Sequence, residues 1–122
     1  MTDQILVRNV MKITEGRLEP FREAVREAIA FVKENGPQLM VRTYIDEQEM
    51  RAFSFQLYRT SEDVLRHWQM SDPYIQKVSQ HCTVEKFEVY GDPSDEVING
   101  LSRFIKDGRG KVTTQLAGFS RF

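Results

Sequence analysis

The sequence predicts one α+β domain, in which two helices cover one face of a four-stranded antiparallel sheet. The first reason is size, because 122 residues with 40% hydrophobic content suffice for one packed core and are too few for two. The second is the order of patterns, since segments with period-2 alternation of apolar residues are interleaved with segments of helical spacing. No long linker or internal repeat interrupts this order, so residues 1–122 are treated as a single domain.

The predicted elements begin with a strand over residues 5–13 and a long helix between Gly16 and Gly36. One period-2 face of the strand is apolar and carries Ile5, Val7, Met11 and Ile13. Apolar residues at helical spacing follow at Leu18, Phe21, Val25, Ala28, Ile29 and Val32. Pro20 is tolerated in the first turn of such a helix, and Gly36 followed by Pro37 ends it.

Three more strands and a second helix complete the core pattern. Residues 39–45 and 51–59 are rich in Val, Ile, Phe and Tyr and are predicted to form a hairpin. A helix follows, and either Thr60 or Ser61 is expected to cap it. This helix is interrupted near Pro73 and then resumes. Residues 83–90 form the last predicted strand of the core. The resulting order, β-α-β-β-α-β, is the split arrangement of ferredoxin-like folds.

Residues 94–122 are predicted to be an addition to this core, which spans residues 5–91. Ser94 caps an extra helix, whose apolar residues recur at helical spacing: Val97, Leu101, Phe104 and Ile105. A strand-like tail then runs to Phe122. We expect the tail from Lys111 onward to cross onto a partner subunit and add a strand to its sheet.

A homodimer is expected because the second face of the sheet is not polar. The strand over residues 51–59 offers Phe53, Phe55 and Leu57 on one side, and Ala52 and Tyr58 on the other. Two subunits packed sheet against sheet would bury both exposed faces through an isologous contact. The alternative is a monomer whose C-terminal helix and tail cover this face.

Charge and cysteine content exclude several classes of function. The 17 Lys and Arg residues against 18 Asp and Glu residues give a net charge of −1, which provides no attraction to nucleic acid or to an anionic membrane. The single cysteine, Cys82, excludes an internal disulfide framework and agrees with a reducing compartment. No signal peptide or membrane span is visible, so a cytoplasmic location is expected.

Three segments carry a family resemblance: Lys12-Ile13-Thr14-Glu15-Gly16-Arg17, Tyr58-Arg59-Thr60-Ser61-Glu62-Asp63, and Trp68-Gln69-Met70-Ser71-Asp72-Pro73-Tyr74. Together with the long helix between the first two, they resemble the antibiotic biosynthesis monooxygenase family over roughly residues 5–91. In that family a bulky ring residue stands three positions before a Ser that opens the next turn, as Trp68 and Ser71 do here. The resemblance implies the dimeric α+β barrel fold and leaves the reaction open.

Asn9 lies in the middle of the apolar face of the first strand, where a buried amide must find partners. It is either satisfied by neighbouring side chains or directed into a cavity. Heme-degrading members of the superfamily resemble this chain in placing an Asn seven positions before a Gly, as with Asn9 and Gly16. They also have an axial His, but the matching position here is Val78, and His81 lies about one turn further on. Heme degradation is therefore the second choice.

Cofactor-independent oxygenases, which convert hydroxylated aromatic substrates to quinones, resemble this chain through Trp68 followed six residues later by Tyr74. The resemblance implies that Asn9 and Tyr74 orient the substrate oxygens, that Trp68 forms an aromatic wall, and that no cofactor is used. The family's Asn one turn before the Trp is Val64 here, and its Arg on the last strand is Glu88. Two polar roles are thus unfilled.

The remaining side chains predict no metal site. His67, His81 and Cys82 show neither a zinc spacing nor a nucleophilic pair, and His67 is expected on a solvated helix face. Trp68 is alternatively a core residue, because it stands at helical spacing from Val64 and Leu65, and the core alternative is open for Tyr74 as well. The function classes left open are a monooxygenase acting on a small aromatic or quinol-like molecule and a non-catalytic dimer that binds a small ligand.

Overall fold

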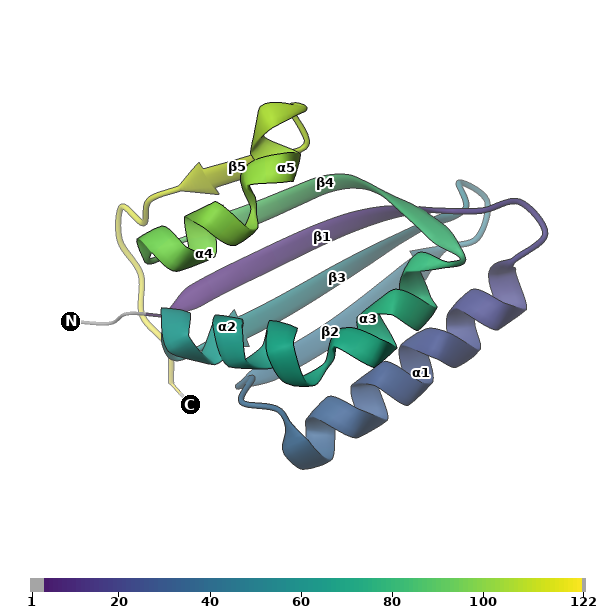
Figure 1. Cartoon of the computed structure of the whole chain (residues 1–122), viewed down its shortest axis with the longest axis horizontal. Coiled ribbons are helices and arrows are strands. Elements are labelled where there is room, and N and C mark those ends of the chain that lie inside the picture. The colour runs from purple at the N-terminus through teal and green to yellow at the C-terminus, as the bar shows by residue number, and fades with distance from the viewer. Residues whose placement is uncertain (1–3, 122) are drawn as a thin grey trace.

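The structure is a computed structural model that describes residues 4–121, and it confirms the predicted fold class (Figure 1). Its elements in chain order are β1 (Ile5–Ile13), α1 (Leu18–Asn35), β2 (Met40–Asp46), β3 (Arg51–Tyr58), α2 (Ser61–Met70), α3 (Asp72–Ser79), β4 (Cys82–Tyr90), α4 (Asp95–Gly100), α5 (Ser102–Lys106) and β5 (Gly110–Thr113). None of the described helices is long and apolar enough to cross a membrane.

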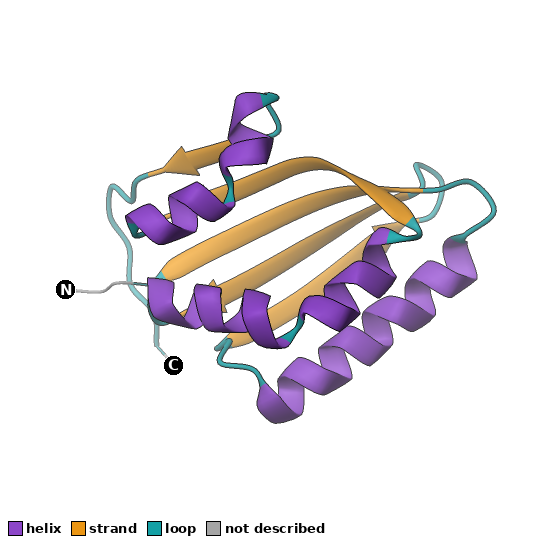
Figure 2. Cartoon of the chain, in the orientation of Figure 1, coloured by secondary structure: helices purple, strands orange, loops and turns teal. Residues whose placement is uncertain are grey.

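The strands form one sheet in the order β2-β3-β1-β4-β5, and the helices lie on one side of it (Figure 2). Neighbouring strands are antiparallel except β4 and β5, which are parallel. We call the side that carries the helices the helix face and the other side the open face. Within the described part of the C-terminal addition, residues 94–121, only Gly110–Thr113 forms a strand, and it extends the sheet of its own chain.

The predicted second helix and C-terminal helix are each divided into two. Ser71 separates α2 from α3, and Leu101 separates α4 from α5. The hydroxyl oxygen of Thr60 accepts a hydrogen bond from the Asp63 amide at 3.2 Å, which caps α2 as expected. Ser94 caps α4 in the same way through the Val97 amide, at 3.3 Å.

Two clusters of buried side chains hold the helices on the sheet. The first combines strand, α2 and α4 residues and consists of Ile5, Val7, Tyr58, Val64, Val89, Val97 and Leu101. The second lies under α1 and consists of Met11, Ile13, Phe21 and Ala52. The C-terminal addition therefore supplies two residues of the first cluster, Val97 and Leu101, which are 0% and 1% exposed. The addition is an integral part of this core.

Candidate functional site

The candidate site lies on the helix face, where a polar residue interrupts the apolar row of β1. Asn9 stands between Val7 and Met11 on this face, and its neighbours across the strands are Ser54 of β3 and Phe87 of β4. Ser54 is buried, and its hydroxyl oxygen accepts a hydrogen bond from the Thr43 hydroxyl at 3.4 Å. A small polar patch, made by Asn9, Ser54 and Thr43, thus sits between the two apolar clusters.

The side-chain oxygen of Asn9, Oδ1, is buried and has no hydrogen-bond partner. An unpaired buried polar group costs about 1–3 kcal/mol, so such an atom calls for an explanation. Ser54 is the strand partner of Asn9 on β3, but it makes no hydrogen bond to this oxygen. Asn9 Oδ1 is therefore free to accept a hydrogen bond from a ligand hydroxyl placed on the helix face.

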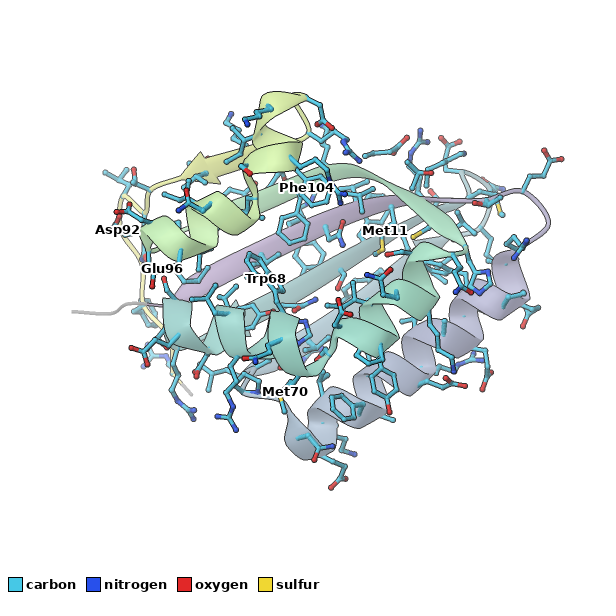
Figure 3. All side chains as sticks on the ribbon, viewed as in Figure 1. Met11, Trp68, Met70, Asp92, Glu96 and Phe104 are labelled. Carbon is cyan, nitrogen blue, oxygen red and sulfur yellow. The ribbon has the colours of Figure 1, made fainter. Side chains whose placement is uncertain are left out.

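Trp68 projects from α2 toward the part of the sheet between α2 and α4 (Figure 3). Its indole packs against the first core cluster, together with Phe87 and Phe104. It also lies against Gly100 of α4, where an added Cβ would come within 2.5 Å of the ring atom Cζ3. Because Phe87 is the strand partner of Asn9, Trp68 and Asn9 border the same aromatic group.

Tyr74 is placed differently from the other two predicted site residues. Its ring stacks on Phe31 of α1, with 4.4 Å between the ring centroids and 22° between the ring planes. This stack belongs to the contact between α1 and α3. The structure thus brings Asn9 and Trp68 to one aromatic group, and it places Tyr74 in a helix–helix contact.

His67 is buried, with 8% of its surface exposed, so the expectation of a solvated face is wrong. Its Nδ1 lies 2.9 Å from the Ser71 hydroxyl oxygen, and its ring is 6.0 Å from that of Tyr58. Burial lowers the pKa of His67 to about 4, which leaves the imidazole neutral at pH 7. A neutral imidazole in this position can donate or accept one further hydrogen bond through Nε2.

The helix α2 is covered on two sides, and this is why His67 is buried. Trp68 is directed toward α4, whereas His67 is directed toward Tyr58 and the turn into α3. The sequence does contain a signal for this, because Val64, His67 and Ser71 follow one another at helical spacings of three and four. The three residues are all buried.

A second buried polar group stands at the end of β3. The Tyr58 hydroxyl donates a hydrogen bond to Gln56 Oε1. The side-chain amide of Gln38 donates to the same oxygen, with 3.5 Å between Gln38 Nε2 and Gln56 Oε1. Burial raises the pKa of Tyr58 well above its ordinary value, so the phenol stays protonated in the physiological range. Tyr58 therefore serves as a hydrogen-bond donor and has no role as a base.

The positions that depart from the family pattern are accounted for by packing. Val64 is a fully buried core residue. Glu88 lies on the open face, where its carboxylate accepts a hydrogen bond from Arg8 at 2.7 Å, and this bond lowers the pKa of Glu88. Glu88 therefore does not take part in a site on the helix face.

The remaining candidates for metal or nucleophilic chemistry are also used structurally. His81 Nδ1 lies 3.1 Å from an Arg17 guanidinium nitrogen, and the Cys82 thiol donates to the Val78 carbonyl at 3.5 Å. Burial raises the pKa of Cys82 to about 11, so this thiol is protonated at pH 7. Among residues 4–121, no cluster of His, Cys, Asp and Glu could hold a metal ion.

The fold and the elements around Asn9 define a small ferredoxin-like α+β protein with a C-terminal addition. No family model and no curated protein sequence matches the chain. Solved structures do match, and the chain has the fold shared by structures described as candidate antibiotic biosynthesis monooxygenases. One of these, a candidate monooxygenase from Caulobacter crescentus CB15, has a TM-score of 0.61 at 15% identity, with 70% of this chain and 88% of that chain covered.

Two further structures show how far the similarity extends. SnoaB, a cofactor-independent oxygenase from Streptomyces nogalater, matches with a TM-score of 0.64 at 9% identity and covers 75% of this chain and 95% of its own. MupZ from Pseudomonas fluorescens matches with a TM-score of 0.77 at 15% identity and covers 97% of this chain and 94% of its own. At these identities the similarity concerns the fold alone.

Proposed function

We propose that this protein is a cofactor-independent monooxygenase of a small hydroxylated aromatic molecule, which binds on the helix face between Asn9 and Trp68. The observation that carries the proposal is the buried, unpaired oxygen of Asn9 beside a group of aromatic rings. An amide oxygen in this environment accepts a hydrogen bond from a phenolic hydroxyl, and the rings of Trp68 and Phe87 pack on the aromatic plane.

The proposed reaction requires few catalytic groups from the protein. A hydroquinone or naphthol that has lost its hydroxyl proton to water can pass one electron to dioxygen. The resulting radical pair combines to form a C–O bond, and the peroxide takes up a proton from water to give a hydroperoxide. Loss of water from this hydroperoxide leaves the quinone, so one oxygen atom enters the product and the other leaves as water. The protein contributes a dry site and hydrogen bonds that hold the substrate oxygens. Asn9 supplies one such bond through its side-chain oxygen.

Replacing Asn9 by Leu is expected to abolish binding and at the same time to stabilise the fold by about 1–2 kcal/mol. The physical reason is that a buried, unpaired side-chain oxygen disappears, and this oxygen is also the acceptor of the ligand hydroxyl. Binding of 2-naphthol is measured by calorimetry, and stability by urea unfolding. Asn35→Leu, in which an exposed asparagine is replaced, is the matched control and should bind normally.

The proposal is tested further by oxygen uptake with hydroquinones and naphthols, followed together with quinone absorbance. An Asn9→Leu variant that binds as the wild type does would remove the site from the helix face. A wild-type protein that binds these molecules without oxygen uptake would favour the non-catalytic ligand-binding alternative. The close packing of Trp68 on Gly100 is the observation that favours this alternative. Hemin belongs in the same panel, because saturable hemin binding would favour the heme-degrading alternative.

We also propose a homodimer formed through the open face of the sheet. Phe53, Phe55 and Leu57 lie on this face and are only partly covered within one chain, while Tyr44 beside them is 53% exposed. Residues 114–120 of the C-terminal tail cover one end of the face, where they line a pocket of about 590 Å³ together with Gln4, Leu6, Leu57 and Tyr90. A second copy would cover the remainder.

Phe55→Arg is expected to convert the dimer to a monomer, because it places a charge in the middle of this apolar face. Sedimentation velocity measures the change. Glu47→Arg, at the exposed hairpin turn, introduces the same side chain outside the face and should leave the dimer intact. A wild-type protein that sediments as a monomer at tens of micromolar would refute the dimer, and so would a dimeric Phe55→Arg variant.

A further inference from the structure

We infer that Phe104, on the C-terminal addition, determines which hydroxylated aromatic molecules fit the candidate site. The ring of Phe104 stacks on Phe87, with 5.5 Å between centroids and 6° between the planes. Phe87 is in turn the strand partner of Asn9. Phe104 therefore forms the next aromatic layer beside the residue that offers the free acceptor. This inference rests on the proposed function of that site.

The Phe104 ring is held in place by cations and by backbone hydrogen bonds. The guanidinium carbons of Arg109 and Arg103 lie 4.7 Å and 5.2 Å from its centroid. Arg109 is fixed because its amide donates to the Phe104 carbonyl at 2.8 Å and its Nη1 donates to the Val84 carbonyl at 2.9 Å. A ring fixed in this way is a rigid wall and cannot move aside without breaking these contacts.

A second contact ties the addition to the opposite wall of the site. Gly100 lies against the Trp68 indole so closely that a Cβ would come within 2.5 Å of the ring. Val97 and Leu101 anchor α4 in the first core cluster next to Trp68. Trp68 and Phe104 thus project from opposite sides toward the space over β1, as Figure 3 shows. The addition sets the position of both rings.

A ligand that reaches Asn9 between these walls must be flat, and its extent toward β4 is limited by the Phe87–Phe104 stack. We expect this limit to lie between two and three fused rings. Removal of the Phe104 ring opens the side toward β4 and leaves the acceptor and the Trp68 wall in place. Phe104 therefore acts on ligand size, and it does not act on the recognition of the hydroxyl group.

The test compares affinities for 2-naphthol and 2-hydroxyanthracene by equilibrium dialysis in the wild type and in Phe104→Ala. The ratio of the affinity for three rings to that for two rings is expected to rise at least tenfold in the variant. Ile105→Ala, which changes the adjacent, exposed side chain of the same helix, is the control and should keep the wild-type ratio. A ratio in Phe104→Ala within twofold of the wild type would overturn the inference.

Phe104→Leu covers the case in which the alanine variant unfolds, because leucine keeps most of the apolar bulk and removes only the planar ring. Its ratio is expected to rise at least threefold, and an unchanged ratio in a folded Phe104→Leu protein would also overturn the inference. The proposed function fails in a distinguishable way. In that case the wild type binds neither compound, and the inference falls with it.

Discussion

The wild-type protein is expected to lose about 2 kcal/mol of stability between pH 7 and pH 5 through His67 alone. Burial lowers the pKa of His67 to about 4 in the folded protein, whereas the ordinary value is 6.5. Below pH 6.5 the unfolded chain therefore binds a proton that the folded protein does not take up until about pH 4. The contribution of the neutral His67 to the free energy of unfolding is complete above pH 6.5. As the pH falls toward 4, this contribution decreases by roughly 1.4 kcal/mol for each pH unit.

Urea unfolding at pH 7, 6 and 5 measures this effect. His67→Gln keeps a side chain that can hydrogen-bond to Ser71 and cannot titrate, so the difference between pH 7 and 5 should shrink by about 2 kcal/mol. An equal slope in wild type and His67→Gln would show that His67 is not buried in solution.

Gly91→Ala is expected to destabilise the fold by about 3 kcal/mol or more. Gly91 follows β4 with a φ of +130°, a conformation that side-chain-bearing residues rarely adopt. A Cβ at this position would also come within 2.8 Å of the Gln4 carbonyl oxygen and 3.3 Å of Ile5 Cδ1. The backbone strain and the clash with a fixed backbone atom therefore add, and both act where the chain leaves the core for the addition.

Gly16→Ala separates these two causes. Gly16 has a φ of +80°, but an added Cβ would meet no heavy atom within 4 Å, so only the backbone strain of about 1 kcal/mol remains. Thermal and urea unfolding of the two variants give the comparison. Equal losses of stability in the two variants would mean that the start of β1 moves away from an added Cβ at Gly91 without a measurable loss of free energy.

Local patterns predict most of the fold because each element carries its own signal. Period-2 alternation in β1 places Asn9 on the helix face, and the capping residues Thr60 and Ser94 mark the starts of α2 and α4. The candidate role of Asn9 follows from the same alternation, since a polar residue in an apolar row is visible without any tertiary information. The partner of Phe104, by contrast, is not visible in the sequence.

The class of fold and the side of the sheet on which Asn9 lies therefore follow from local sequence patterns, because both depend on periodicities of two and 3.6 residues. Three features are visible only in the folded chain: His67 is buried, Tyr74 stacks on Phe31, and the addition packs on Trp68. Each of these depends on which helix covers which neighbour. Which helix packs on which neighbour depends on contacts between segments far apart in the chain. The spacing of residues within one segment carries no information about such contacts.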